Sequence, residues 1–99
     1  MALYLASYDI PEKDRDEYQK LWDYFDSLGA SKILFSEYAV PFDGTALDLA
    51  NKINAHLRSG DRLFVCELFN GEGTCAWVNL KISDTAFQTL LTDSARTLK

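Results

Sequence analysis

The chain has 99 residues, 47% of them hydrophobic, and a formal net charge of −5. This length suits one domain over residues 1–99 with a single core, and the hydrophobic share excludes a disordered chain. No apolar run approaches the roughly 20 residues of a membrane-spanning helix, and the N-terminus does not show the pattern of an export signal. We therefore expect a cytoplasmic protein that does not enter a membrane.

The charges and cysteines narrow the function classes further. Fifteen acidic against ten basic residues count against a broad nucleic-acid surface, because phosphate binding depends on clustered Lys and Arg, although a local basic patch stays open. Cys66 and Cys75 do not have the spacing or the companion histidines of a zinc site. If Asn70-Gly71 forms a hairpin turn, the two cysteines lie opposite each other. Reduced packing residues are then the expectation, and a disulfide is the alternative.

Residues 1–11 predict a buried first strand that ends in a carboxylate. Apolar residues at positions 3, 5 and 8, with Tyr4 and Ala6 between them, suit a strand covered on both faces. Asp9 lies where this strand ends, and Pro11 can open a helix because its missing N–H would have no partner there. From its position alone, Asp9 is either a metal ligand or a residue that hydrogen-bonds the following turn.

Two helices with an extended segment between them follow the first strand. Acidic residues after Pro11 and apolar residues at spacings of three and four predict a helix over about 12–28, with Gly29 as its left-handed cap. Residues 31–40 predict one bent strand or two short ones divided near Ser36-Glu37, ended by Pro41 and Asp43-Gly44. Asp43 or Thr45 can then cap a second helix over about 45–58.

The last third of the chain predicts two strands and a helix. Residues 62–69 are apolar almost throughout, as expected of a central strand. Asn70-Gly71-Glu72-Gly73 is a strong turn signal, and residues 74–82 have the pattern of a further strand. Ser83-Asp84 then caps a final helix. The apolar side of this helix is formed by Phe87, Leu90, Leu91, Ala95 and Leu98.

Together these elements predict an α+β fold of the ferredoxin-like type. Two strand–helix–strand halves form a core over about 1–69, and right-handed crossovers place both helices on one face of an antiparallel sheet. The C-terminal strand and helix, about 74–96, are an addition to that core. The aromatic residues are too numerous for one small core, so we expect a homodimer through the other sheet face or the C-terminal strand.

Four short segments resemble the CRISPR-associated protein 2 family, the small ferredoxin-like subunit of spacer acquisition. Leu3 to Ile10 is similar to its first strand, which ends in Tyr-Asp and an apolar residue. The helix that ends in Leu28-Gly29 has the length and place of the family's first helix. Residues 33–38, with Ser36, are similar to its second strand, and residues 60–65 to the start of its last core strand. The likeness extends over about residues 3–69.

The resemblance implies a homodimer in which the first-strand aspartates, here Asp9 of each subunit, face each other near a twofold axis. Two such carboxylates would hold one Mg²⁺, which would activate a water for endonuclease cleavage of RNA or DNA. Tyr8 and Ser36 would line the same cleft, with packing or sheet-edge roles as the alternative. Other members of the family are not catalytic, and they bridge integrase subunits and contact DNA phosphates.

The chain departs from the family where basic residues are expected. Residues 12–17 hold four acids and two bases where the family has arginines, and Leu34-Phe35 replace a glutamine and a basic residue. We therefore expect a divergent, stand-alone relative. The alternatives are a toxin-type ribonuclease, a non-catalytic dimeric adaptor and a regulatory domain that binds a small molecule. The remaining basic candidates, interpreted as solvated residues, are Lys13, Arg15, Lys20 and His56.

Overall fold

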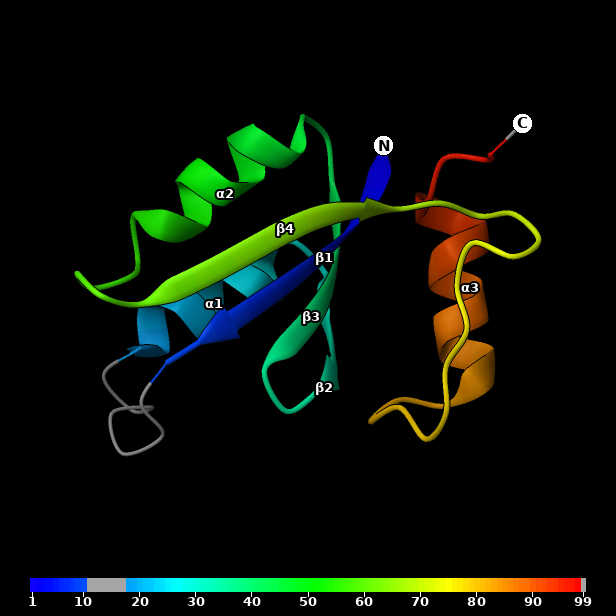
Figure 1. Ribbon diagram of the computed structural model, residues 1–99, viewed down its shortest axis with the longest axis horizontal. Helices are drawn as coiled ribbons and strands as arrows, with labels where there is room; N and C mark the ends of the chain where they lie inside the picture. Colours follow the sequence, from blue (N-terminus) through cyan, green and yellow to red (C-terminus); the bar gives the residue numbers. More distant parts are fainter. Residues whose placement is uncertain (11–17, 99) are drawn as a thin grey trace.

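The computed structural model describes residues 1–10 and 18–98, and in them the chain is an α+β protein (Figure 1). The strands are β1 (Ala2–Asp9), β2 (Ser31–Leu34), β3 (Glu37–Phe42) and β4 (Arg62–Leu68), and the helices are α1 (Gln19–Ser27), α2 (Ala46–Asn54) and α3 (Asp84–Ser94). The strands form one antiparallel sheet in the order β2-β3-β1-β4. The predicted class and the order of the elements up to β4 are confirmed.

Helices α1 and α2 cover the same face of the sheet, which we call the helix face. Apolar and aromatic side chains from both helices and from alternate positions of β1 and β3 form the larger buried cluster there. At its centre the rings of Phe25 and Tyr38 stack with centroids 4.2 Å apart, and Tyr8 packs beside both. The prediction that both helices lie on one face is confirmed. The buried members are Ala2, Tyr4, Ala6, Tyr8, Tyr18, Leu21, Phe25, Tyr38, Val40, Phe42, Leu49 and Ile53.

The ends of these helices follow local sequence signals. Gly29 has φ +71°, the left-handed conformation expected after α1, whereas the predicted start of that helix falls on residues outside the described part. The Thr45 side chain accepts a hydrogen bond from the backbone N–H of Asp48, and the Asp48 side chain accepts one from that of Thr45. In the described part of the chain, no helix has the length and apolar composition needed to cross a membrane.

Helix α2 ends at Asn54, earlier than the predicted end at residue 58. Beyond it the backbone bonds tighten, because His56 N donates to Ile53 O at 2.9 Å and Leu57 N donates to Asn54 O at 3.1 Å. The chain then turns into β4 through residues 58–61, where the Asp61 side chain accepts a bond from Arg58 N. A local turn therefore shortens the helix while leaving its buried face intact.

The opposite face of the sheet is covered at one end by α3 and by the loop of residues 70–83. Phe87 and Leu91 of α3 are buried against Leu3, Ile33 and Ala39, and we call these residues the second apolar cluster. Figure 1 shows α3 standing across β2 and β3 from the other two helices. The cap on α3 is the predicted one, since Ser83 Oγ accepts from the backbone N–H of Ala86. Leu90 and Ala95 pack against this cluster as predicted, whereas Leu98 lies beyond the helix and is exposed.

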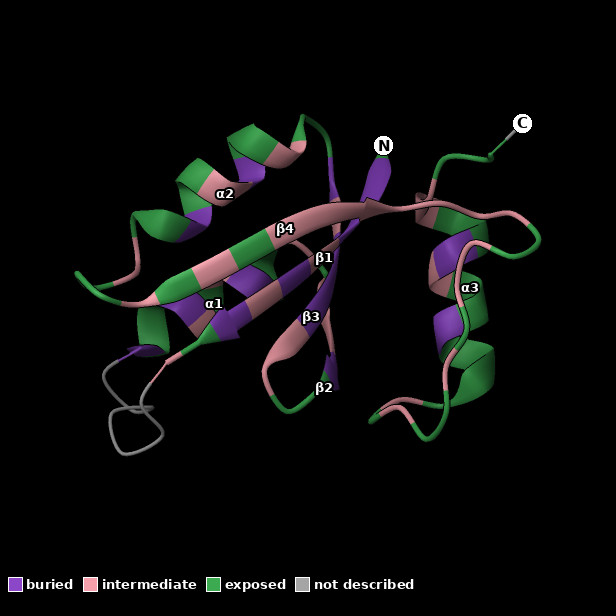
Figure 2. Cartoon of the chain, viewed as in Figure 1, coloured by how far each residue is buried: buried purple, intermediate pink, exposed green. Residues whose placement is uncertain are grey.

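None of the described residues covers the other half of that face. Residues paired across an antiparallel sheet point to the same side, so the register places side chains in rows. One row joins Ser7 with Glu37 of β3 and Phe64 of β4, and the last joins Asp9 with Arg62. Burial decreases along β4 toward this end of the sheet. Figure 2 shows that β4 is half-buried near α3 and largely exposed at its start. We call these five residues, with Leu34 paired to Glu37, the open half-face.

The predicted C-terminal strand is wrong. Residues 74–82 lie in a loop, and Asn70-Gly71 starts no hairpin. Instead Asn70 N donates to Arg96 O at 2.9 Å, and Leu98 N donates to Asn70 O at 3.1 Å. Because the backbone groups of Asn70 bond to the C-terminal segment, the chain leaves the sheet there. Cys75 and Trp77, the apolar residues at alternating positions, lie in this loop and pack against the second apolar cluster.

The apolar pattern of β4 predicted a central strand, and this is wrong. Strand β4 lies at the edge of the sheet and pairs with β1. The apolar character of β4 has another cause, because both of its faces are partly covered. Helix α2 packs on one face, and Leu68 on the other face packs against the second apolar cluster. The extended segment proves to be two strands with Phe35 and Ser36 in the turn. Pro41 lies inside β3 rather than ending it, at a level where β2 no longer pairs, so its missing N–H costs no bond there.

Candidate functional site

Asp9 is the last residue of β1, and its side chain lies on the open half-face. Its Oδ2 is 3.8 Å from Nη1 of Arg62, and the two side chains are 74% and 82% exposed. An exposed pair of this kind contributes little to stability, because water screens both charges and both side chains lose freedom. The carboxylate is therefore accessible to a ligand and has a cation beside it.

A hollow of about 220 Å³ adjoins this pair. Its lining includes Ser7, Asp9, Arg62 and Phe64, so it combines a carboxylate, a guanidinium and an aromatic ring. A carboxylate can accept hydrogen bonds or bind a cation, and a guanidinium can bind a phosphate through two parallel hydrogen bonds. The hollow is shallow enough that Phe64 remains 64% exposed, which leaves an apolar surface next to the charges.

Tyr8 and Ser36 lie near Asp9 but do not add side chains to its face in the same way. The backbone N–H of Tyr8 donates to Ser36 O at 3.0 Å, which joins the end of β1 to the turn between β2 and β3. Tyr8 belongs to the lining of the hollow, yet its ring lies in the helix-face core with Trp22 at 5.6 Å. The structure therefore brings the three residues to one end of the sheet with Asp9 directed to the other face.

The described residues of one chain do not form a magnesium site at Asp9. In the part of the chain that the structure describes, no three His, Cys, Asp or Glu residues form a group that could hold a metal ion. Mg²⁺ needs oxygen ligands and is commonly held by one or two carboxylates and several waters. A second Asp9 could provide the missing carboxylate, but the guanidinium of Arg62 beside each one opposes a divalent cation. The residues fit the metal only if Arg62 turns away in a dimer.

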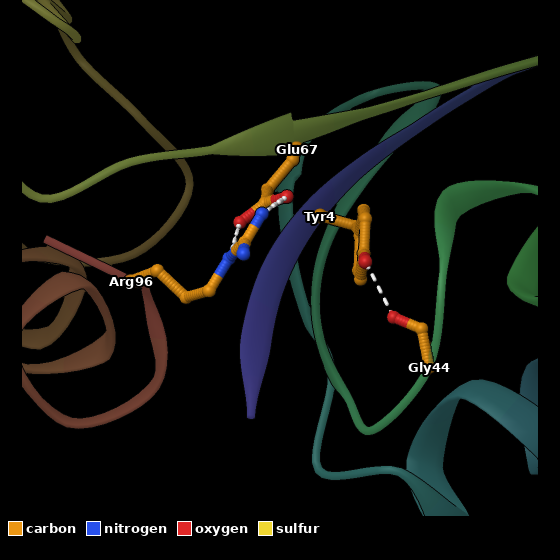
Figure 3. A network of polar contacts seen from close by, with 4 residues as sticks. All are labelled: Tyr4, Gly44, Glu67 and Arg96. Atoms are coloured by element: carbon orange, nitrogen blue, oxygen red, sulfur yellow. Dashed lines mark hydrogen bonds and ion pairs between the residues drawn. The ribbon is translucent and has the colours of Figure 1, made fainter. Parts of the chain in front are cut away.

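A second polar cluster lies at the opposite end of the sheet (Figure 3). Arg96 Nε donates to Glu67 Oε2 at 2.6 Å and Nη2 donates to Oε1 at 2.5 Å, a two-bond pair between the C-terminal segment and β4. On β1, the Tyr4 hydroxyl donates to Gly44 O at 2.5 Å. Tyr4 and Glu67 are partners in the sheet register, so the cluster joins β1, β4, the loop before α2 and the C-terminal segment.

The charges of this cluster hold it together rather than expose a reactive group. The hydrogen bonds from Arg96 hold the pKa of the Glu67 carboxyl below its ordinary value. Burial, and after it the charge of Glu67, raises the pKa of the Tyr4 phenol. An adjoining hollow of about 310 Å³ reaches Tyr4, Glu67, Arg96 and the loop at Gly44. The Tyr4 hydroxyl, the Glu67 carboxylate and two of the guanidinium nitrogens of Arg96 have partners inside the chain (Figure 3), so we assign the cluster a structural role.

The geometry does not support a reactive or catalytic role for either cysteine. Both are free and half-buried. Burial, with a smaller contribution from Glu37, raises the pKa of the Cys66 thiol, which disfavours the reactive thiolate. The predicted packing role is consistent with this placement, although Cys75 reaches its position from a loop and not from a strand opposite Cys66.

Two of the four basic candidates, His56 and Lys20, lie in the described part of the chain. His56 lies just after α2, with its ring 5.3 Å from the Tyr24 ring, and Lys20 is exposed on α1. Lys13 and Arg15 fall outside the described residues. Sequence reasoning missed Arg62, the cation next to Asp9, and also Ser7, Glu37 and Phe64 beside it. Period-two alternation along β4 could have grouped Arg62 with Phe64, but only the strand register places them beside Asp9.

The fold and the Asp9 end of the sheet define a class: a small α+β protein with one packed sheet face and one half-open face that carries an exposed acid and base. No protein-family model matches the chain, and no solved structure matches it.

Proposed function

We propose that the protein is a ferredoxin-like homodimer of the CRISPR-associated protein 2 type, assembled through the open half-face. The observation that supports this most is Phe64, which is 64% exposed on a strand whose partner strand is otherwise mostly buried. In a ferredoxin-like sheet the face away from the two crossover helices needs a cover. Here α3 covers only one end of it, so a second chain would cover the rest.

The composition of the open half-face suits such a contact. Phe64 and the 40% exposed Leu34 lie at opposite sides of one row, and Ser7 and Glu37 lie between them. An aromatic residue within a polar rim is typical of the centre of a protein–protein interface. Asp9 and Arg62 carry opposite charges, so a twofold contact could pair Asp9 of each chain with Arg62 of the other. The same contact would bring two Asp9 carboxylates toward one axis.

The experiment for the dimer compares two exposed apolar residues. Phe64→Asp should convert a dimer to a monomer in sedimentation or light scattering, because it buries a charge in the contact. Leu47→Asp is the matched control: Leu47 is 69% exposed, but on the outer surface of α2. It should leave the oligomeric state unchanged. A monomeric wild-type protein at millimolar concentration, or equal effects of both variants, contradicts the proposal.

A second candidate function is metal-dependent cleavage of RNA or DNA by the two Asp9 carboxylates that the dimer would bring together. Its specific support is the exposed Asp9 beside Arg62, since the carboxylates could hold Mg²⁺ between two chains while the guanidinium binds a phosphate. This role requires Arg62 to leave the metal side of the carboxylate. If Arg62 stays in place, the dimer serves instead as a non-catalytic adaptor that contacts nucleic acid or an integrase subunit.

Cleavage and binding assays separate these roles. For a nuclease, Mg²⁺ or Mn²⁺ should stimulate cleavage of single-stranded RNA or DNA, and Asp9→Asn should abolish it, whereas Asp26→Asn on the outer side of α1 should not. An adaptor should bind nucleic acid more tightly at low salt without cleaving it, and Arg62→Ala should weaken that binding. A dimer that neither binds nor cleaves nucleic acid retains the proposed assembly and rejects both nucleic-acid roles.

A further inference from the structure

A crevice of about 290 Å³ lies between the sheet and the α3 layer, next to the open half-face. The sheet contributes Leu5, Ile33 and Glu37, and the other wall includes Trp77, Leu80 and Phe87. The rings of Trp77 and Phe87 meet edge to face, with centroids 4.7 Å apart. The two walls thus come from segments far apart in the sequence, which meet through the second apolar cluster.

The crevice leaves apolar side chains incompletely packed. Leu5, Leu68, Cys75, Trp77 and Leu80 are all only half-buried, although each packs against the second cluster. The helix-face cluster at the same strands contains side chains that are completely buried. Protein interiors normally fill such gaps, because an apolar wall without a neighbour loses dispersion contacts and stays wet. An apolar group of the right size would therefore gain burial by entering the crevice.

One charge selects the ligand. Among the described residues that line the crevice, Glu37 is the one that carries a formal charge. Ser7 Oγ donates a long 3.5 Å bond to Glu37 Oε1, which leaves most of the carboxylate's hydrogen-bonding capacity unused by that contact. A carboxylate beside aromatic walls favours a cation and disfavours an anion, because its charge attracts the cation and the ring faces add a cation–π attraction.

From this arrangement we propose that the crevice is a binding site for a small apolar or aromatic ammonium compound, with the ammonium group at Glu37 and the apolar body between Leu5, Trp77 and Phe87. Such a pocket, apolar with few polar groups placed at its opening, is the usual form of a small-molecule site. The proposal stands apart from the nucleic-acid roles. It concerns dimerisation because Glu37 and Leu34 belong both to the crevice and to the open half-face, on which the second chain would lie.

The probe for this site is 2-phenylethylammonium, compared with 2-phenylethanol and phenylacetate as its neutral and anionic counterparts. Binding is followed by NMR through the indole N–H of Trp77, which donates to Asp84 Oδ1 at 3.0 Å and so has a defined position. The ammonium probe should bind at least about tenfold more tightly than the alcohol, and phenylacetate should bind most weakly. Glu37→Gln should remove the preference for the ammonium probe and leave the affinity for the alcohol unchanged.

Two comparisons make the test decisive. Asp26→Asn removes the same charge from an exposed site on α1 and should leave every affinity unchanged. The titration is repeated in Phe64→Asp, because a second chain on the half-face could close the crevice. Selective binding in either protein supports the site, and binding in Phe64→Asp alone adds that the dimer covers it. Equal affinity for the three probes, no binding in either protein, or equal effects of Glu37→Gln and Asp26→Asn overturns the proposal.

Discussion

The two faces of one strand differ sharply in this protein. On the helix face, alternate residues of β1 from Ala2 to Tyr8 are all buried. On the opposite face, burial declines along the strand, from Leu3 with no exposure to the half-buried Ser7 and the exposed Asp9. The first face is closed by two helices that the fold requires. Among the described residues, the second is closed only as far as α3 reaches, so the two sides of one sheet differ in how completely they are buried.

The largest effect on stability is expected from Phe25→Ala on the helix face. Phe25 has no exposed surface and stacks on Tyr38, so its truncation leaves a cavity that rigid neighbours cannot fill. We expect the free energy of unfolding to fall by about 3–5 kcal/mol. Urea denaturation followed by circular dichroism measures the change. A loss below about 1 kcal/mol would mean that the helix face is not the rigid side.

Phe87→Ala tests the α3 side. Phe87 is buried, but the crevice lies next to it and several of its neighbours are half-buried, so the site can collapse more easily. We expect a loss near the lower end of the range for such changes, about 3 kcal/mol. Amide exchange should accelerate most in α3 and least in α1 and α2. Uniform acceleration over the whole chain would contradict the separation of the two faces.

Acid should release the C-terminal segment before the rest of the fold. The hydrogen bonds from Arg96 lower the pKa of Glu67 in the folded chain. The stabilisation is thus complete above the ordinary carboxyl pKa, about 4.3, and is lost as the pH falls through that value to the lower folded pKa. The amides of Asn70 and Leu98, which bond the C-terminal segment to the chain just beyond β4, should then exchange faster. In Glu67→Gln they should exchange fast at neutral pH as well.

The smallest effect on folding is expected from Phe64→Ser. Because Phe64 is largely exposed in one chain, its removal should change the free energy of unfolding by no more than about 0.5 kcal/mol at dilute protein concentration. At high concentration a dimer would add stability to the wild type by mass action, and the difference between the two proteins should grow. A large, concentration-independent loss would show that Phe64 belongs to the core of the single chain.

The sequence predicted what depends on near neighbours. The apolar spacing of α1, the Gly29 cap, the Thr45 cap of α2 and the Ser83 cap of α3 are all present. These features hold because their interactions join residues within about one helical turn. The end of β1 at Asp9 belongs to the same group, so the principal candidate residue could be placed, though not its surroundings.

Other predictions failed where distant segments compete for the same groups. The turn signal at Asn70-Gly71 was real in composition, but the backbone of Asn70 bonds to Arg96 and Leu98 instead. Residues 74–82 had strand alternation, yet they bury their apolar side chains from a loop. A periodic pattern reports which side chains need burial, not which strand or loop satisfies that need. The edge position of β4 was missed for the same reason.

The sequence by itself determined most of the apolar faces of the three helices, the caps at Gly29, Thr45 and Ser83, the class of the fold and the place of Asp9 at the end of the first strand. Only the tertiary structure decided that Arg62 stands beside Asp9, that Phe64 shares a row with Ser7 and Glu37, and that α3 covers half a sheet face. Register between strands distant in sequence depends on the pairing of whole strands and on the layer that covers them. That pairing creates both the open half-face and the crevice beside it.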